Sequence, residues 1–245
     1  MKTFTTVGRI FFAISLAVFG LQYLLFATGR PGPVAGPPLT VGNKTWALLL
    51  GLGFLVAAAS IASKKMAGCA ALAVAIAFLL RVVLAFLPKI ASNVHDPGPW
   101  TSGAEVLCLC GGALVLAASL WPLTGPGSKT MASAGRILLA VPLIVFGMQH
   151  YLYAAFVATL VPAWIPARLF WAYFVGTAFF AACVSIVARR MPSLGAGLLG
   201  LMFLLWVFIV HLPRVMSALQ NGNEWTSMFV ALAMSGCAFM IAGRS

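Results

Sequence analysis

The sequence predicts an all-α fold, a polytopic membrane helical bundle of eight transmembrane helices arranged as two parallel four-helix repeats. Three observations predict this fold. Hydrophobic residues make up 62% of the 245 residues and charged residues only 7%, whereas a soluble domain carries about 25% charged residues. Apolar segments long enough to cross a bilayer recur along the chain, and motifs of its first half recur in its second half. So apolar a surface requires lipid around it rather than water.

Eight segments qualify as lipid-spanning helices, because a bilayer requires about 20 mainly apolar residues whose backbone groups are satisfied within the segment. The predicted spans are 8–27, 45–63, 67–87, 103–121, 135–158, 169–188, 194–212 and 226–242. Proline and glycine clusters mark their borders. These clusters are Pro31-Gly32-Pro33, Pro37-Pro38, Pro97-Gly98-Pro99 and Gly125-Pro126-Gly127.

Short motifs repeat between the two halves at an almost constant separation. The Gly-Arg-Ile motif at 8–10 returns at 135–137, and the basic pair at 64–65 returns at 189–190. This predicts two four-helix units, residues 1–126 and 127–245. It also argues against a cleaved signal peptide at the N-terminus, because the first apolar segment has a counterpart deep in the chain.

The topology follows from the repeat and the basic residues. An even number of helices per unit makes both halves run in the same direction, so their symmetry axis is expected along the membrane normal. Nine Lys and Arg residues lie on the side of the termini and five on the other side. We therefore expect both termini to be cytoplasmic, in a membrane of the bacterial cytoplasmic type. The formal charge of +12 is then explained by topology and lipid head groups, so nucleic acid is not an expected partner.

Polar residues inside or beside the spans are the candidate ligand-binding residues. With a rise of about 1.5 Å per residue, the intramembrane ionisable groups fall in the outer part of the bilayer, where they are functional candidates by default. We expect a polar layer that lines an outward-facing pocket, formed by His150, Gln149, Tyr153, His211, Arg81, Glu105 and Gln22. The sequence identifies no catalytic residue, and its scattered histidines and cysteines predict no metal site.

Several of these residues also have structural interpretations. Arg81 is close enough to the outer boundary to extend its side chain to the head groups. Glu105 fits either a capping box with Ser102 or an ion pair with Arg81. His150 is suited to holding a quinone carbonyl or relaying a proton, but also to bonding a neighbouring helix. The alternative interpretation of His211 is an ordinary residue at the membrane–water interface.

The second half carries a family resemblance. Its Gly-Arg-Ile-Leu-Leu at 135–139, Val-Phe-Gly at 145–147 followed by Gln149-His150, and His-Leu-Pro-Arg at 211–214 followed by Trp225 resemble DoxX-like integral membrane proteins. The resemblance covers nearly the whole chain as two such units. It implies a link to membrane redox complexes, as in thiosulfate oxidation with quinone as acceptor. The first half departs from the pattern, with Phe-Leu-Pro-Lys at 86–89, which places an expected site mainly on the second unit.

The expected function is therefore a DoxX-like membrane subunit that binds a quinone or other small redox-linked molecule within or beside a membrane oxidoreductase complex. A subunit or accessory role is favoured over a self-sufficient enzyme, with quinone as ligand and no covalent cofactor. The expected partners are membrane lipid and oxidoreductase subunits, and the sequence leaves the oligomeric state open. The alternatives are a small-molecule or ion transporter and a noncatalytic scaffold or assembly factor.

Overall fold

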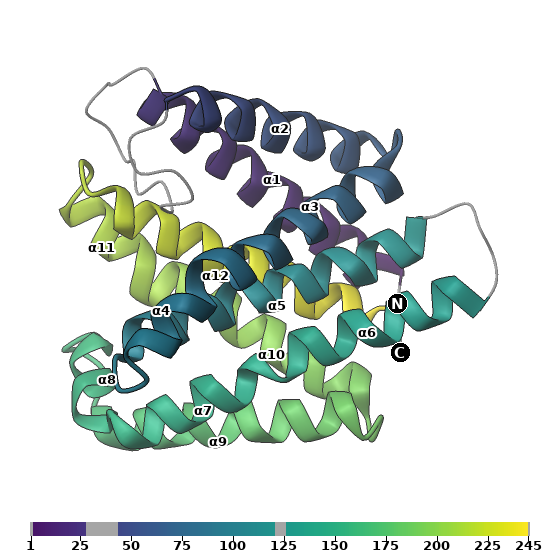
Figure 1. The fold of residues 1–245 in the computed structure, drawn as a ribbon. Coiled ribbons are helices and arrows are strands. Elements are labelled where there is room, and N and C mark those ends of the chain that lie inside the picture. Colours follow the sequence, from purple (N-terminus) through teal and green to yellow (C-terminus); the bar gives the residue numbers. More distant parts are fainter. Residues whose placement is uncertain (1, 28–43, 121–125, 245) are drawn as a thin grey trace.

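The computed structural model describes residues 2–27, 44–120 and 126–244, and all regular structure in these ranges is helical (Figure 1). Eight of its helical segments are long and apolar enough to cross a membrane. They are Thr3–Ala27, Lys44–Ser63, Ala67–Ser92, Pro97–Leu120, Gly127–Leu152, Arg168–Val187, Pro192–Ser217 and Gly222–Ala242. The predicted all-α membrane fold and its eight spans are confirmed in these terms of length and composition.

Five spans are single helices and three are built from shorter pieces. The single helices are α1 (Lys2–Ala27), α2 (Lys44–Ser63), α5 (Pro97–Leu120), α9 (Arg168–Val187) and α12 (Gly222–Ala242). The composite spans are α3 (Ala67–Arg81) with η1 (Val82–Phe86) and α4 (Leu87–Ser92), α6 (Pro126–Ala140) with α7 (Pro142–Leu152), and α10 (Pro192–Trp206) with η2 (Val207–His211) and α11 (Leu212–Ser217). The short α8 (Ala154–Leu160) follows α7.

Prolines explain the interruptions. A proline inside a helix has no N–H to donate, and its ring crowds the carbonyl four residues earlier. Pro88 and Pro213 stand just after the π-helical turns η1 and η2, which redistribute the backbone hydrogen bonds at these two points. Pro142 likewise begins α7 where α6 ends.

Several predicted boundaries were wrong because prolines begin helices here. The cluster at 97–99 was interpreted as a border before a span at 103, but Pro97 opens α5, since its fixed φ suits the first helical turn. Pro126 opens α6 in the same way, well before the predicted start at 135. The predicted end of that span at 158 falls instead in α8. The clusters at 31–33 and 37–38 lie outside the described residues.

Helices α5 and α12 form the centre of the bundle. In their most apolar stretches 72% and 67% of residues are buried, against 28–39% in the other six spans. Both helices are rich in glycine, alanine and cysteine. Small side chains let helix backbones approach closely where lipid supplies no hydrophobic driving force between helices. The remaining spans surround this pair and leave their outer faces for lipid.

The two halves of the chain interlock. Helix α1 packs against both α2 and α12, and α5 packs against α6 as well as α3. Glycines mark these crossings, because Gly8 of α1 lies against Gly236 of α12 and Gly111 of α5 lies against Gly135 of α6. Each central helix therefore contacts the first helix of the other half.

The two ends of the bundle are formed by different segments of the chain. Both termini and the α2–α3 and α9–α10 connections lie at one end, and α4, α8 and α11 lie at the other (Figure 1). We refer to them as the terminal end and the distal end. The candidate polar residues Arg81 and His211 come from segments that run toward the distal end.

Local features also recur between the halves at a separation of 125 residues. The tight turns after α2 and α9 both place a basic residue at positive φ, with Lys64 at 63° and Arg189 at 55°. The indole Nε1 atoms of Trp100 and Trp225 donate to the carbonyls of Val94 and Leu219, each at 3.0 Å. These pairs are consistent with the predicted sequence repeat. The division into units 1–126 and 127–245 remains a prediction.

Candidate functional site

Arg81 ends α3 in the interior of the first half. Its guanidinium carbon lies 5.2 Å from the ring centroid of Phe86, a cation–π arrangement. The Nε atom is buried and has no hydrogen-bond partner within the described part of the chain. The electrostatic neighbours of its charge are Tyr23 and Glu105. Arg81 thus presents a charged donor in an apolar setting.

Tyr23 of α1 supplies a second unused polar group beside Arg81. Its side chain is only 2% exposed, and its ring stacks on Phe54 at 5.8 Å, which in turn contacts Phe78 at 5.8 Å. The hydroxyl is buried and lacks a partner among the described residues. Tyr23 is not among the residues of the predicted polar layer. Its only sequence signal is a tyrosine near the end of an apolar segment, which is too common to identify a site.

Glu105 does not form the predicted capping box. Ser102 and Glu105 both lie inside α5, and the first turn is instead capped by Asp96, whose Oδ1 accepts from the amide of Gly98 at 3.0 Å. The predicted ion pair with Arg81 is also absent, because the described residues hold one salt bridge and it joins two other groups. Glu105 is half-buried and stays an electrostatic neighbour of Arg81 without direct contact.

His150 of α7 occupies an aromatic environment in the second half. Its ring stacks against Trp206 at 6.2 Å with an interplanar angle of 15°, and meets Phe179 edge-on at 5.3 Å. Nδ1 lies 2.8 Å from the carbonyl oxygen of Phe146 on the same helix. A carbonyl only accepts, so Nδ1 carries the proton, and in the neutral ring Nε2 is the acceptor.

Each environment contains a pair of phenylalanine rings, and the two pairs are 125 residues apart in the sequence. Phe54 and Phe78 correspond to Phe179 and Phe203, which are also 5.8 Å apart. At corresponding positions of the repeated motifs, the first half has Tyr23, Arg81, Phe86 and Glu105, and the second half has His150, Trp206, His211 and Val230. The first half thus holds a cation with unused donors, and the second half holds an aromatic cage with one acceptor nitrogen.

Gln22 and Gln149 link helices rather than line a free surface. The Gln149 amide donates to the Pro97 carbonyl at 3.1 Å and its oxygen accepts from Thr101 at 2.9 Å. In the same way, the Gln22 amide donates to the Gly222 carbonyl at 3.4 Å and its oxygen accepts from Thr226 at 3.3 Å. Both glutamines therefore attach the first helix of one half to the first turn of the central helix of the other half.

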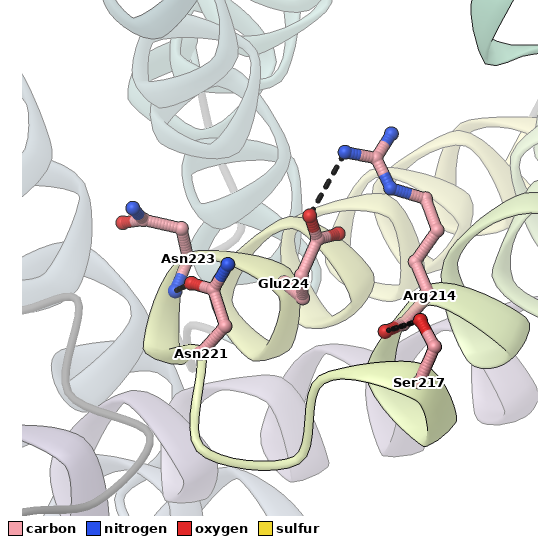
Figure 2. A network of polar contacts seen from close by, with 5 residues as sticks. All are labelled: Arg214, Ser217, Asn221, Asn223 and Glu224. Atoms are coloured by element: carbon pink, nitrogen blue, oxygen red, sulfur yellow. Dashed lines mark hydrogen bonds and ion pairs between the residues drawn. The ribbon is translucent and has the colours of Figure 1, made fainter.

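His211 closes η2 near the distal end. Its Nδ1 is buried without a partner within the described residues. The charges of Arg214 and Glu224 act on it, and these two residues form an ion pair at 2.8 Å between α11 and the first turn of α12 (Figure 2). The arginine side chain is 43% exposed and the glutamate 16%. A distal-end ion pair of this exposure is worth little by itself.

The described contacts divide the predicted polar layer into separate groups. Arg81, Tyr23 and Glu105 form one group, and His150 with its aromatic neighbours forms another. Tyr153 lies between α7 and α8, is 39% exposed and makes no side-chain hydrogen bond within the described ranges. Within the part of the chain that the structure describes, no hydrogen bond, ion pair or ring contact joins Arg81 to His150.

The arrangement of the first group determines what it is suited to bind. A charged N–H and a hydroxyl, both buried and both unused, are suited to a ligand that brings a hydrogen-bond acceptor into an apolar, aromatic environment. Comparison with known proteins gives no further guide, because no family model, no curated protein and no solved structure matches this chain.

Proposed function

We propose that this chain is a DoxX-like membrane protein that binds a quinone or other small redox-linked carbonyl compound, in a subunit or accessory role beside a membrane oxidoreductase. The observation that supports it is the pair of buried, unused donors, Arg81 Nε and the Tyr23 hydroxyl. Leaving such groups unpaired costs about 1–3 kcal/mol each. A bound carbonyl oxygen would remove this cost, which gives the ligand part of its affinity.

The surroundings of the two donors favour a planar apolar ligand. Phe54 stacks on Tyr23 and contacts Phe78, and Phe86 lies beside the Arg81 guanidinium. Aromatic rings of this kind pack well against a flat conjugated ring. A quinone combines such a ring with carbonyl acceptors. An anionic form produced by reduction would be stabilised further by the guanidinium of Arg81.

A direct test is quinone binding to the full chain. The protein is purified into nanodiscs and exposed to a short-chain photoreactive quinone, and labelled residues are mapped by mass spectrometry alongside an affinity measurement. Arg81→Met and Tyr23→Phe should each weaken binding about tenfold or more, as expected for the loss of a hydrogen bond of about 1.4 kcal/mol or more. Arg214→Met removes one positive charge at the distal end and should leave the affinity unchanged.

Other outcomes would exclude the proposed quinone site or favour one of the two alternative functions. Equal quinone affinity in the parent and in both donor variants would exclude this location for the site. Absence of quinone binding together with selective solute uptake in proteoliposomes would favour the transporter. Absence of both, with stable copurification of other membrane subunits in mild detergent, would favour the scaffold.

A further inference from the structure

Three arginines converge at the terminal end, far from the Arg81 group. Arg136 comes from α6, Arg189 from the turn after α9 and Arg244 from the residues after α12. The positive charges of Arg189 and Arg244 both act on the guanidinium of Arg136. Helices α6 and α9 are in contact, and Val115, whose carbonyl accepts from Arg244, lies against Gly135, the residue before Arg136. The cluster is therefore formed by three elements that are distant in sequence.

The repeat supplies a control inside the molecule, because Arg9 is the counterpart of Arg136. The Nη1 atom of Arg9 donates to the carbonyls of Ile61 and Ala62 at 2.6 and 2.7 Å, and only 7% of the residue is exposed. Its guanidinium thus satisfies the carbonyl end of α2. This Arg9 donor therefore stabilises the packing of α1 against α2.

Arg136 makes no such bond to the end of a neighbouring helix among the described residues. Its one side-chain hydrogen bond among the described residues goes to the Ser133 hydroxyl on its own helix at 3.0 Å. The residue is half-buried, with Arg189 and Arg244 exposed beside it. Arg244 reaches the Val115 carbonyl of α5 at 3.3 Å, which anchors this cation next to the others. Among the residues that the structure describes, most of the N–H donors of the three side chains have no acceptor.

Negative side chains do not balance this cluster. The three acidic residues of the chain are Asp96 before α5, Glu105 within α5 and Glu224 in the first turn of α12. Helices α5 and α12 both begin at the distal end (Figure 1), so these three residues belong to the distal half of the bundle, whereas the arginines come from segments at the terminal end. Like charges held together without a counter-charge repel one another, and an anion placed between them removes that cost.

We propose that Arg136, Arg189 and Arg244 form a binding site for a phosphate group. Guanidinium groups present planar pairs of donors that match phosphate oxygens, which makes arginine the preferred residue for such sites. At this end of the bundle the phosphate belongs either to the head group of an anionic lipid or to a free phosphorylated solute. This site is independent of the proposed quinone site.

The experiment uses the full chain and two phosphate sources. In the lipid arm, the protein is reconstituted with phosphatidylcholine and a minority of phosphatidylglycerol, and the lipid that it retains after transfer to detergent is measured by native mass spectrometry. In the solute arm, inorganic phosphate is titrated into protein in phosphatidylcholine alone, and binding is measured by isothermal calorimetry. Retained phosphatidylglycerol identifies a lipid ligand, and saturable phosphate binding identifies a solute; either result supports the site.

Arg136→Gln should lower retention or affinity about tenfold, because one charge-assisted contact to phosphate is lost. Arg136→Lys keeps the charge and should recover part of the loss. The matched control is Arg190→Gln, which removes the same charge from the residue next to Arg189 and should change binding by less than about twofold. A melting temperature equal to that of the parent in neutral detergent shows that the variants are folded.

Two results would overturn the site. If Arg190→Gln and Arg136→Gln weaken binding equally, the effect is one of general surface charge. If neither phosphatidylglycerol nor phosphate binds saturably to the parent protein, the cluster holds no phosphate.

Discussion

Gly236 of α12 lies so close to Gly8 of α1 that a Cβ atom built on Gly236 would stand 2.6 Å from the carbonyl oxygen of Gly8. The equivalent crossing in the other half has the same geometry, with a Cβ on Gly135 falling 2.6 Å from the carbonyl oxygen of Gly111. Only hydrogen fits at these positions. The two contacts set the distance between the halves at the centre of the bundle.

Gly236→Ala and Gly135→Ala should therefore each destabilise the protein by about 1–3 kcal/mol, because the added methyl group pushes two backbones apart. Thermal unfolding in a mild detergent measures the loss. Gly53→Ala is the matched control, since a Cβ there meets no atom within 4 Å and alanine favours the helix. A control that unfolds as early as the crossing variants would show that helix glycines are needed for some other reason.

The glutamine links predict a measurable coupling between the halves. Gln149→Leu removes the hydrogen bonds to Pro97 and Thr101 and should cost about 1 kcal/mol, in the range of interhelical polar contacts in membranes. A double-mutant cycle of Gln149→Leu with Thr101→Val should give a coupling of about 0.6 kcal/mol. Additive effects of the two substitutions would mean that the bond contributes nothing to stability.

Arg9 and Arg136 should differ in their effects on stability despite their equivalent positions. Arg9→Met leaves the carbonyls of Ile61 and Ala62 without their donor and should cost about 2 kcal/mol or more. Arg136→Met breaks one contact with Ser133 and should cost less than about 1 kcal/mol. Unfolding of both variants in neutral detergent compares them directly. Similar losses would mean that Arg136 also holds the fold together.

Tyr23→Phe separates a structural role from a binding role. The hydroxyl has no partner within the described residues, so its removal should leave the ligand-free protein as stable or raise its stability by about 1 kcal/mol. The stabilisation that added quinone gives to the parent should decrease in this variant. The measurement is the melting temperature with and without quinone. A lower stability of the ligand-free variant would reveal a structural bond to the hydroxyl.

The eight spans could be predicted from the sequence because lipid makes the rule for length and polarity strict. The boundaries were harder to predict. Pro97 and Pro126 were interpreted as breaks, whereas proline is equally suited to the first turn of a helix. The capping box at Ser102 failed for the same reason, because α5 had already begun five residues earlier.

The candidate site shows a different limit. Arg81 was identified because a charge inside an apolar segment is visible in the sequence. Tyr23 was not, because its importance depends on α1, α2 and α3 meeting around one point. Gln149 was expected to face a ligand, but the first turn of α5 lies opposite and accepts its hydrogen bond. Contacts between distant segments decide such roles, and no local pattern encodes them.

The pairing of α1 with α12 also bears on how the protein is made. Helix α1 is translated long before α12, against which it packs, so the face of α1 around Gly8 and Phe12 has no partner in the bilayer until residues 222–242 have been made. The hairpin of α1 and α2, fastened by Arg9, is the stable unit during that interval. Chains that stop before residue 222 should therefore insert but stay open along this face, where membrane chaperones and proteases recognise incomplete products.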